Sequence, residues 1–465
     1  MKFIKRSTEL KYIPIKYYST NRKSPEVSLE EALLKGLAPD GGLYMPDSFP
    51  LLTREELESF YSREYYEIAF IILSKFVGND INSQDLLRLC QDAYNFGIPL
   101  EKVSGRKYIM RLDQGPTASF KDFAARMMSR LMNYYQTINH QHLTVLTATS
   151  GDTGSAVANA FYGLENINVI ILFPDNEVTL MQRKQMTTLQ KNIMVVAVDG
   201  KFDDCQKLVK QAFLDPSLSQ IPLSSANSIN IGRLLPQAIY YFYSWSRLSG
   251  KLNDKPVFSV PSGNFGNLMG GLIAREMGLP VERFIISTNE NDEVPEFLRT
   301  GNYKSINPSR NCISSAMNVG HPSNLARIVD LYNGMMNETG TIIKRPDLEG
   351  MRKDFFAVSV SDDQTRRTIA DIYKQYDILL EPHGATAWYG IQELIKSDGN
   401  FYTDKQLCIS LETAHPAKFP IEIKKVIKVD PLLPPSLAGI AEKNEKYLEL
   451  ENNYKELKEL LLKNY

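Results

Sequence analysis

Lys121 is the residue whose type and position most strongly suggest chemistry. It lies in the stretch DQGPTASFKDFAARMM, residues 113–128, where a helix is expected to begin. From Phe120 onward the apolar residues recur at the three- and four-residue spacing of one helix face. Ser119 stands in the position of an N-cap, and Asp122 follows three residues later, as in a capping box. A cation in this first turn opposes the helix dipole at a cost of up to about 1 kcal/mol, so helix stability does not explain the lysine.

Two interpretations of Lys121 are open at this point. A solvated surface lysine is the commoner case for a lysine taken alone. The alternative is an amine that burial and the helix start keep neutral, and a neutral amine can form a Schiff base or accept a proton. Other parts of the chain must supply a partner to decide between them.

Two strand-to-helix junctions carry polar, glycine-rich turns, TATSGDTGSAVANAF (147–161) and SVPSGNFGNLMGG (259–271). Glycines allow close approach of the backbone, and the free N–H groups of a helix start bind phosphate or carboxylate. An ordinary capped turn explains either one alone, but the pair favours a ligand that carries an anion. No GxxxxGK[ST] or GxGxxG motif occurs, so the known nucleotide fingerprints are missing. A phosphate site together with a lysine at a helix start suggests pyridoxal phosphate, which carries one phosphate and bonds an enzyme lysine.

The bulk properties of the 465-residue chain exclude several classes of function. A net charge of −1 gives no electrostatic reason to expect nucleic acid or an anionic membrane as partner. No apolar run approaches the length of a membrane span, and the basic N-terminus lacks the apolar core of a secretory signal. The four cysteines are scattered without a CxxC pair, which predicts neither a disulfide framework nor a metal site. We therefore expect a cytoplasmic protein with a small-molecule substrate.

The elements that must position these residues follow an α/β pattern. The first hundred residues are expected to be mostly helical, with capping boxes at Ser28 and Thr53. Beyond them, short, nearly continuous apolar runs alternate with helix-length segments, which predicts strands buried on both faces in largely parallel sheets. The seven runs are 142–149, 168–174, 193–200, 255–261, 283–289, 355–360 and 406–412. Residues 301–350 are expected to form loops and short helices next to a site.

The C-terminal residues form a separate feature. Tyr447, Leu450, Tyr454, Leu457 and Leu461 alternate by three and four among Glu and Lys. Two heptads are too few for a coiled coil, so we expect a terminal helix packed on its own domain, with a dimer contact as the alternative. The chain is expected to be a monomer or a homodimer.

The chain resembles the threonine synthase family. Six motifs occur in that family's order: GPTASFKDF, TATSGDTG, NSINIGRLLPQ, SVPSGNFGN, LEPHGATAW and LETAHPAKFP. The opening YYSTNRKSPEVSLEEALLKGLAPDGGLYMP is also similar to that family's N-terminal domain. The resemblance implies the type II fold of pyridoxal-phosphate enzymes. It divides the chain into an N-terminal domain (1–100), a two-lobed catalytic region (101–425) and a helical tail (426–465).

The resemblance also implies a role for individual residues. Lys121 would be the Schiff-base lysine and later the proton shuttle. Thr413 would place its hydroxyl at the pyridine nitrogen of the cofactor. The cofactor phosphate would be held by Gly263, Asn264, Phe265 and Asn267. The substrate carboxylate or the cofactor ring would meet Thr149, Ser150, Gly151, Asp152 and Thr153, although Asp152 could instead simply cap a helix.

The reaction implied is the conversion of O-phospho-L-homoserine and water to L-threonine and phosphate. Its leaving phosphate needs cationic or donor-rich partners, for which Ser228, Asn230 and Arg233 are the candidates, with Arg111 and Lys184 as outsiders. Many family members have His before GPT where this chain has Gln114, which puts an acid–base role at that position in doubt. A phospholyase releasing 2-oxobutyrate is the alternative within the fold, and a non-catalytic binding protein is the alternative outside enzymes.

Overall fold

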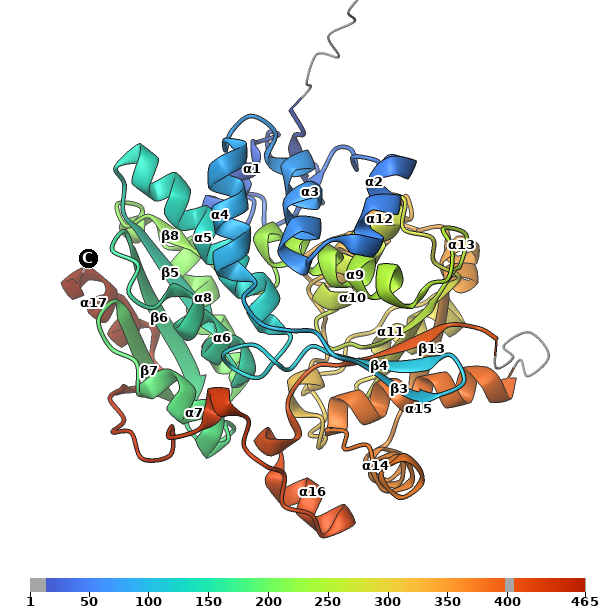
Figure 1. Cartoon of the computed structure of the whole chain (residues 1–465). Helices are drawn as coiled ribbons and strands as arrows, with labels where there is room; N and C mark the ends of the chain where they lie inside the picture. Colours follow the sequence, from blue (N-terminus) through green and yellow to red (C-terminus); the bar gives the residue numbers. More distant parts are fainter. Residues whose placement is uncertain (1–13, 398–404, 465) are drawn as a thin grey trace, which may run out of the picture.

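The computed structural model describes residues 14–397 and 405–464, so the basic N-terminal stretch discussed above lies almost wholly outside the described residues. The N-terminal part is a small helical layer with one two-stranded antiparallel ribbon (Figure 1). Its elements are β1 (Tyr17–Ser19), α1 (Leu29–Lys35), β2 (Tyr44–Pro46), α2 (Arg54–Ser59), η1 (Phe60–Ser62), α3 (Tyr65–Val77) and α4 (Ser83–Ala93). Thr53 and Glu56 form a reciprocal capping box at α2, and the Ser28 hydroxyl accepts a hydrogen bond from the Glu31 N–H at α1, so both helix starts are where the sequence predicts them.

A five-stranded, all-parallel sheet forms one lobe, in the order β15-β7-β6-β5-β8. Its strands are β5 (Leu143–Ala148), β6 (Ile167–Pro174), β7 (Ile193–Asp199), β8 (Leu223–Ser224) and β15 (Leu448–Glu451). Its flanking helices are α5 (Lys121–Asn139), α6 (Asp152–Phe161), α7 (Leu180–Thr187), α8 (Phe202–Leu214) and α17 (Tyr454–Asn464). Alternate side chains of β5 and β6 enter two separate cores, one shared with α5 and α6 and the other with α8 and α17.

A six-stranded sheet forms the other lobe, in the order β13-β10-β9-β14-β4-β3, parallel except for the β3–β4 pair. Its strands are β3 (Leu100–Ser104), β4 (Lys107–Arg111), β9 (Val257–Pro261), β10 (Arg283–Thr288), β13 (Phe355–Ser359) and β14 (Cys408–Glu412). Helices α9 (Ala238–Leu248) and α10 (Gly266–Glu276) cover one face, and α14 (Asp362–Tyr376) and α15 (Pro382–Ser397) cover the other (Figure 1). The N-terminal helices join this lobe, because α3 packs on α9 within the largest core.

The remaining elements connect the two lobes or cap them. They are η2 (Pro216–Leu218), η3 (Ile231–Arg233), η4 (Leu235–Gln237), α11 (Glu293–Thr300), η5 (Ser315–Met317), α12 (Leu325–Leu331), β11 (Met335–Met336), β12 (Ile342–Lys344), α13 (Leu348–Asp354), η6 (Pro416–Lys418), α16 (Pro420–Ile427) and η7 (Pro435–Leu437). The loops and short helices expected over 301–350 are therefore present. Among the described residues, no helix is long and apolar enough to cross a membrane.

The C-terminal seam is only partly helical, which corrects the sequence interpretation. Leu450 lies on β15, which pairs in parallel with β7, and the helix begins only at Tyr454. The edge of β7 offers unpaired backbone groups, and strand pairing satisfies them better than an extra helical turn would. Leu457 and Leu461 are fully buried against α8, so the expected packing of the terminal helix on its own chain is confirmed.

Candidate active site

A cavity lies where the carboxyl ends of strands from both sheets meet. The turn after β5 comes from the five-stranded sheet, and the turns after β9 and β14 come from the six-stranded sheet. Ligands of open parallel sheets bind in this location because the turns leave helix starts and polar side chains facing one crevice. The sequence-predicted residues that line the cavity are Lys121, Ser150, Asp152, Thr153, Ser228, Arg233, Gly263, Asn264, Phe265, Asn267 and Thr413. Thr149, Gly151 and Asn230 are not part of its lining and instead support it.

The start of α5 differs from the capping box that the sequence predicts. Phe120 is the N-cap, in a helical conformation, and makes no side-chain cap. Ser119 instead forms an isolated β-bridge with Ala414, which draws it away from the helix end. The Asp122 carboxylate reaches further back, where it accepts hydrogen bonds from the Thr117 N–H at 2.8 Å and the Thr117 hydroxyl at 2.7 Å. This tie fixes the turn that presents Lys121 at the first helical position.

Lys121 is a largely buried lysine, so the surface interpretation is wrong. Its side chain is 14% exposed, and its Nζ lies 3.7 Å from Oδ2 of Asp152. Burial, opposed by the Asp152 carboxylate and reinforced by Lys418, lowers the pKa of Lys121 to about 8. Burial alone would raise the pKa of Asp152, but Lys418 and Lys121 hold it well below its usual range. The site therefore combines an amine that is neutral at mildly alkaline pH with a permanently ionised carboxylate.

The turn after β5 is shaped to start α6 and to orient Asp152. The Thr149 hydroxyl accepts hydrogen bonds from the N–H groups of Gly151 at 2.9 Å and Gly154 at 2.7 Å. Gly151 has φ +127°, and a Cβ on it would lie 2.5 Å from the Gln182 side chain, so only glycine fits. Gln182 in turn donates to Oδ1 of Asp152 at 2.9 Å. Ser150 and Thr153 are left facing the cavity at the N-terminal end of α6.

The turn between β9 and α10 forms a tightly packed cradle at the edge of the cavity. Gly263 is packed so closely that a Cβ would lie 2.9 Å from Cα of Met317 and 3.0 Å from the carbonyl oxygen of Ala316. Phe265 adopts φ +61° immediately before α10 begins at Gly266. Asn267 holds the turn together, since it donates to the Pro261 carbonyl at 2.8 Å and accepts from the Leu268 N–H at 3.0 Å. Gly266 and Asn267, the first residues of α10, line the cavity, and a helix start leaves their N–H groups without intrahelical acceptors.

Arg233 brings a buried positive charge to the same cavity. It is 4% exposed, donates from NH1 to the Ala226 carbonyl at 2.5 Å, and leaves its Nε buried without a partner. Burial lowers the pKa of Arg233 to about 10, with Asp122 opposing the shift. Asn230 shapes the segment that carries it, donating to the carbonyls of Leu33 and Ser225. A buried guanidinium with a free donor is suited to bind an anion in the cavity.

Thr413 belongs to a hydrogen-bonded group at the start of α15. Its hydroxyl donates to Oε1 of Glu381 at 3.5 Å. His383 Nε2 accepts from the Ala316 N–H at 3.1 Å, so its Nδ1 carries the proton and donates to Oε2 of Glu381. Behind them, burial and Glu381 raise the pKa of Glu412 well above its usual range. The wall around Thr413 is therefore a fixed polar network.

The two weaker candidates for binding the leaving phosphate, Arg111 and Lys184, have other partners, and so does Gln114. Arg111 pairs with Glu101 and Glu412, and Lys184 donates to backbone carbonyls near the C-terminus, so neither lines the cavity. Gln114 is exposed and donates its side-chain amide to Oδ1 of Asp113 at 2.8 Å.

Sequence reasoning missed several residues of the site. His383 and Met317 line the cavity, and Glu381 and Lys418 contact residues that do. His383 and Lys418 lie within the motifs LEPHGATAW and LETAHPAKFP, which were the available signal. Nothing in the sequence around Met317 identifies it as part of a cavity wall.

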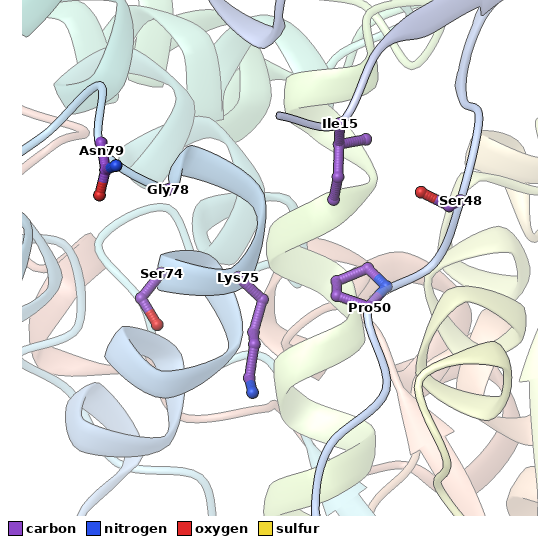
Figure 2. Close-up of a pocket in the computed structure, with 7 residues that line it drawn as sticks. All are labelled: Ile15, Ser48, Pro50, Ser74, Lys75, Gly78 and Asn79. Carbon is purple, nitrogen blue, oxygen red and sulfur yellow. The ribbon is translucent and has the colours of Figure 1, made fainter. Parts of the chain in front are cut away.

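A second hollow lies on the N-terminal layer, away from this chemistry. It runs between α3 and the segments that carry Ile15 and Pro50 (Figure 2). Lys75 is the one charged residue of the seven that line it, and Lys75 pairs with Glu56 at 2.7 Å. The hollow therefore offers a paired cation and ordinary polar groups, without the unpartnered buried donor that marks the first cavity.

Family profiles match three successive parts of the chain. Residues 16–94 match the profile described as threonine synthase N terminus, residues 97–410 match the pyridoxal-phosphate dependent enzyme profile, and residues 391–461 match the profile described as threonine synthase, C-terminal. Threonine synthase from Haemophilus influenzae is 38% identical over 96% of this chain and 99% of its own length. Threonine synthase from Escherichia coli K12 is 36% identical over 92% of this chain and 95% of its own.

Solved structures give the same relationship. The crystal structure of threonine synthase from Escherichia coli has a TM-score of 0.86 and 35% identity, covering 97% of this chain and all of its own. That of pyridoxal-phosphate-bound threonine synthase from Brucella melitensis has a TM-score of 0.87 and 33% identity, covering 96% of this chain and 98% of its own. The expected fold, with largely parallel sheets flanked by helices, is confirmed.

Proposed function

Because the chain belongs to the threonine synthase family of pyridoxal-phosphate-dependent enzymes, we propose that its cavity converts O-phospho-L-homoserine and water to L-threonine and phosphate. Membership makes the chain a lyase of threonine biosynthesis with pyridoxal phosphate as its cofactor. The observation that carries the assignment of the cavity is the meeting of a largely buried lysine, a helix start and a buried arginine whose Nε has no partner in one place.

The residues of the cavity fit the cofactor. The turn at Gly263 leaves no space for a Cβ and lines the cavity at the start of α10, which suits a phosphate. We assign the phosphate to the main-chain N–H groups of Gly263, Asn264 and Phe265, with Asn267 holding the turn, and the pyridine nitrogen to the Thr413 hydroxyl. When bound, pyridoxal phosphate supplies an aldehyde for the lysine amine and a ring that withdraws electrons from the substrate carbon.

Lys121 does the proton chemistry in this proposal. Because the pKa of Lys121 is lowered, a usable share of its amine is neutral near neutral pH. This neutral amine would be the nucleophile that bonds the cofactor. Nζ would take the proton from the α-carbon of the substrate and would deliver protons at neighbouring carbons. Asp152, 3.7 Å away and ionised, keeps Nζ oriented toward the cavity.

The substrate carries two anionic groups, and the cavity has a place for each. Arg233, with its free Nε and with Ser228 beside it in the lining, is assigned to the leaving phosphate. Asn230 supports this segment from behind. The N-terminal end of α6, with Ser150 and Thr153, is assigned to the substrate carboxylate, and Thr149 and Gly151 shape that turn.

The same proposal covers the organisation of the chain. We divide it into an N-terminal domain (1–100), a catalytic region (101–425) and a C-terminal tail (426–465). The tail buries Leu457 and Leu461 on its own chain, which fits a monomer or a homodimer joined elsewhere. Four buried free thiols fit the reducing cytoplasm.

The test supplies the purified protein and pyridoxal phosphate with O-phospho-L-homoserine and quantifies phosphate, threonine and 2-oxobutyrate together. We expect threonine to match phosphate one for one, and no product from Lys121→Ala. Phosphate matched by 2-oxobutyrate would overturn the proposal in favour of a phospholyase. Failure to release phosphate from protein that holds the cofactor on Lys121 would overturn the substrate assignment alone.

A further inference from the structure

Lys418 is a second lysine at the site, and it is more deeply buried than Lys121. Its side chain is fully buried, and its Nζ lies 2.5 Å from Oδ1 of Asp152. It also donates to the Thr117 carbonyl at 3.1 Å, in the turn that leads into α5. Lys418 ends the short η6 helix after β14, so the six-stranded lobe reaches across to a carboxylate that belongs to the five-stranded lobe.

The Asp152 carboxylate is thus shared unequally between two ammonium groups. Lys418 holds Oδ1 within hydrogen-bond distance, together with Gln182 at 2.9 Å, whereas Lys121 faces Oδ2 at 3.7 Å. A buried carboxylate requires one compensating cation. Lys418 supplies that cation through the closer contact. Lys121 can therefore lose its proton without leaving Asp152 uncompensated.

We propose that Lys418 is a positioning residue that binds Asp152 as its closest counter-ion and so leaves the Lys121 amine available for covalent attachment and proton transfer. This inference rests on the proposed role of Lys121. If Lys418 were neutral, Asp152 would have only Lys121 as its close cation and would hold the proton on that amine. The ammonium at position 418 would act through charge, beyond its contribution to packing.

The other charged groups around Lys121 do not replace this function. Arg233, in η3, lowers the pKa of Lys121, and Glu381, at the start of α15, raises it. Both effects are smaller than those of Asp152 and Lys418. Arg233 is also the cation assigned to the substrate phosphate, so its charge is needed elsewhere. Lys418 is the cation in direct contact with the carboxylate that faces Lys121.

The experiment measures the titration of Lys121 by competitive acetylation of the full chain freed of cofactor, with the Lys121 peptide quantified by mass spectrometry between pH 6 and 10. Lys418→Gln keeps an N–H donor for the Thr117 carbonyl and removes the charge, whereas Lys418→Arg keeps the charge. Lys424→Met, at a side chain that is 64% exposed, is the matched control.

We expect a midpoint near 8 in the native chain and in the Lys424 and Lys418→Arg variants. In Lys418→Gln the midpoint should rise by about one pH unit or more. At pH 7 the fraction of neutral amine, and with it the rate of pyridoxal phosphate attachment, should then fall about tenfold. An unchanged midpoint in folded Lys418→Gln would overturn the inference, as would an equal rise in Lys418→Arg.

Should Lys418→Gln fail to fold by circular dichroism, Asp152→Asn supplies the second measurement. It removes the carboxylate that favours protonated Lys121, so the midpoint must fall below that of the native chain; a rise would overturn the inference. Both readouts follow the amine itself. If borohydride reduction found the cofactor on another residue, the proposed role of Lys121 would be overturned, while these readouts would still show whether Lys418 sets the titration of the Lys121 amine.

Discussion

Replacing Lys121 by Met should stabilise the chain that is free of cofactor, in a pH-dependent way. The pKa of Lys121 is lowered from 10.5 to about 8 in the folded chain because its charge is buried. Below pH 8 the lysine is protonated in both states, so folding must bury the charge and the full cost is present. Between pH 8 and 10.5 the folded amine is neutral while the unfolded one is still protonated, and the cost declines. Above 10.5 both are neutral and the cost is gone.

The size of the effect follows from the shift. A lowering of about 2.5 units corresponds to roughly 3 kcal/mol at pH 7, declining to about 2 kcal/mol at pH 9 and about 1 kcal/mol at pH 10. Asp152 remains paired with Lys418 in the Lys121→Met variant, so the substitution leaves no orphaned carboxylate. The contribution of the methionine side chain to packing is independent of pH. The pH-dependent part of the difference therefore reports the buried charge.

The assay is urea unfolding of the cofactor-free chain and of Lys121→Met, followed by circular dichroism at pH 7 and pH 10. The gain in free energy of unfolding should shrink by about 2 kcal/mol between these pH values. Lys424→Met, at an exposed lysine, should show the same small difference at both. An equal gain for Lys121→Met at pH 7 and pH 10 would refute the reasoning, because the ammonium would then be at no disadvantage in the fold.

Three further predictions concern the cradle, the polar network and the tail. Gly263→Ala should weaken pyridoxal phosphate binding about tenfold or more in a fluorescence titration, because a Cβ there meets backbone atoms, whereas Gly97→Ala, with open space around it, should not. Burial raises the pKa of the Glu412 carboxyl, so the native chain loses stability as the pH rises above 4.5. Glu412→Gln has no carboxyl to ionise, so its melting temperature should exceed that of the native chain from pH 5 to 8. Leu461→Ala should cost about 2–5 kcal/mol of unfolding free energy in urea titrations, against about 0.5 kcal/mol or less for Leu462→Ala at a side chain that is 42% exposed.

Local patterns explain which parts of the fold the sequence predicts well. All seven apolar runs became parallel strands, and for all but the edge strand β13 continuous Val, Ile and Phe over a strand length suits a position covered on both faces. The capping box at Thr53 was also predicted, since its two hydrogen bonds join residues three positions apart. The glycine-rich turns were found for the same reason, as strand, turn and helix follow one another directly in the chain.

Contacts between distant segments explain what the sequence did not predict. Ser119 was expected to cap α5, but its bridge to Ala414 overrides the local preference. The strand at Leu450 forms only because the edge of β7 stands beside it. Lys418 meets Asp152 across the two lobes, and a motif match alone shows neither the partner nor the distance. In each case the deciding neighbour lies hundreds of residues away or on another element.

Arg327 shows why the N-terminal layer matters to the site. It is fully buried, and burial lowers its pKa to about 9. Its guanidinium donates to the carbonyl of Tyr44 in β2 at 3.1 Å, to that of Ser228 at 3.2 Å, and to Oδ1 of Asn324 at 2.6 Å. Asn324 donates onward to the carbonyl of Asn264 at 2.9 Å. One side chain thus joins the N-terminal ribbon, the segment that leads to Arg233 and the turn between β9 and α10.

The acceptors around Arg327 are backbone and amide oxygens, which solvate a cation without neutralising it. Arg233 also has no anionic partner in these contacts, since its NH1 donates to a carbonyl oxygen and its Nε has no partner. Burying two such charges is unfavourable unless an anion completes the site. A cofactor and a substrate that each carry a phosphate would supply the missing negative charge. Arg233 lines the cavity, so a phosphate bound there would compensate its charge, whereas Arg327 lies outside the lining and would hold the segment of Ser228 in place from behind.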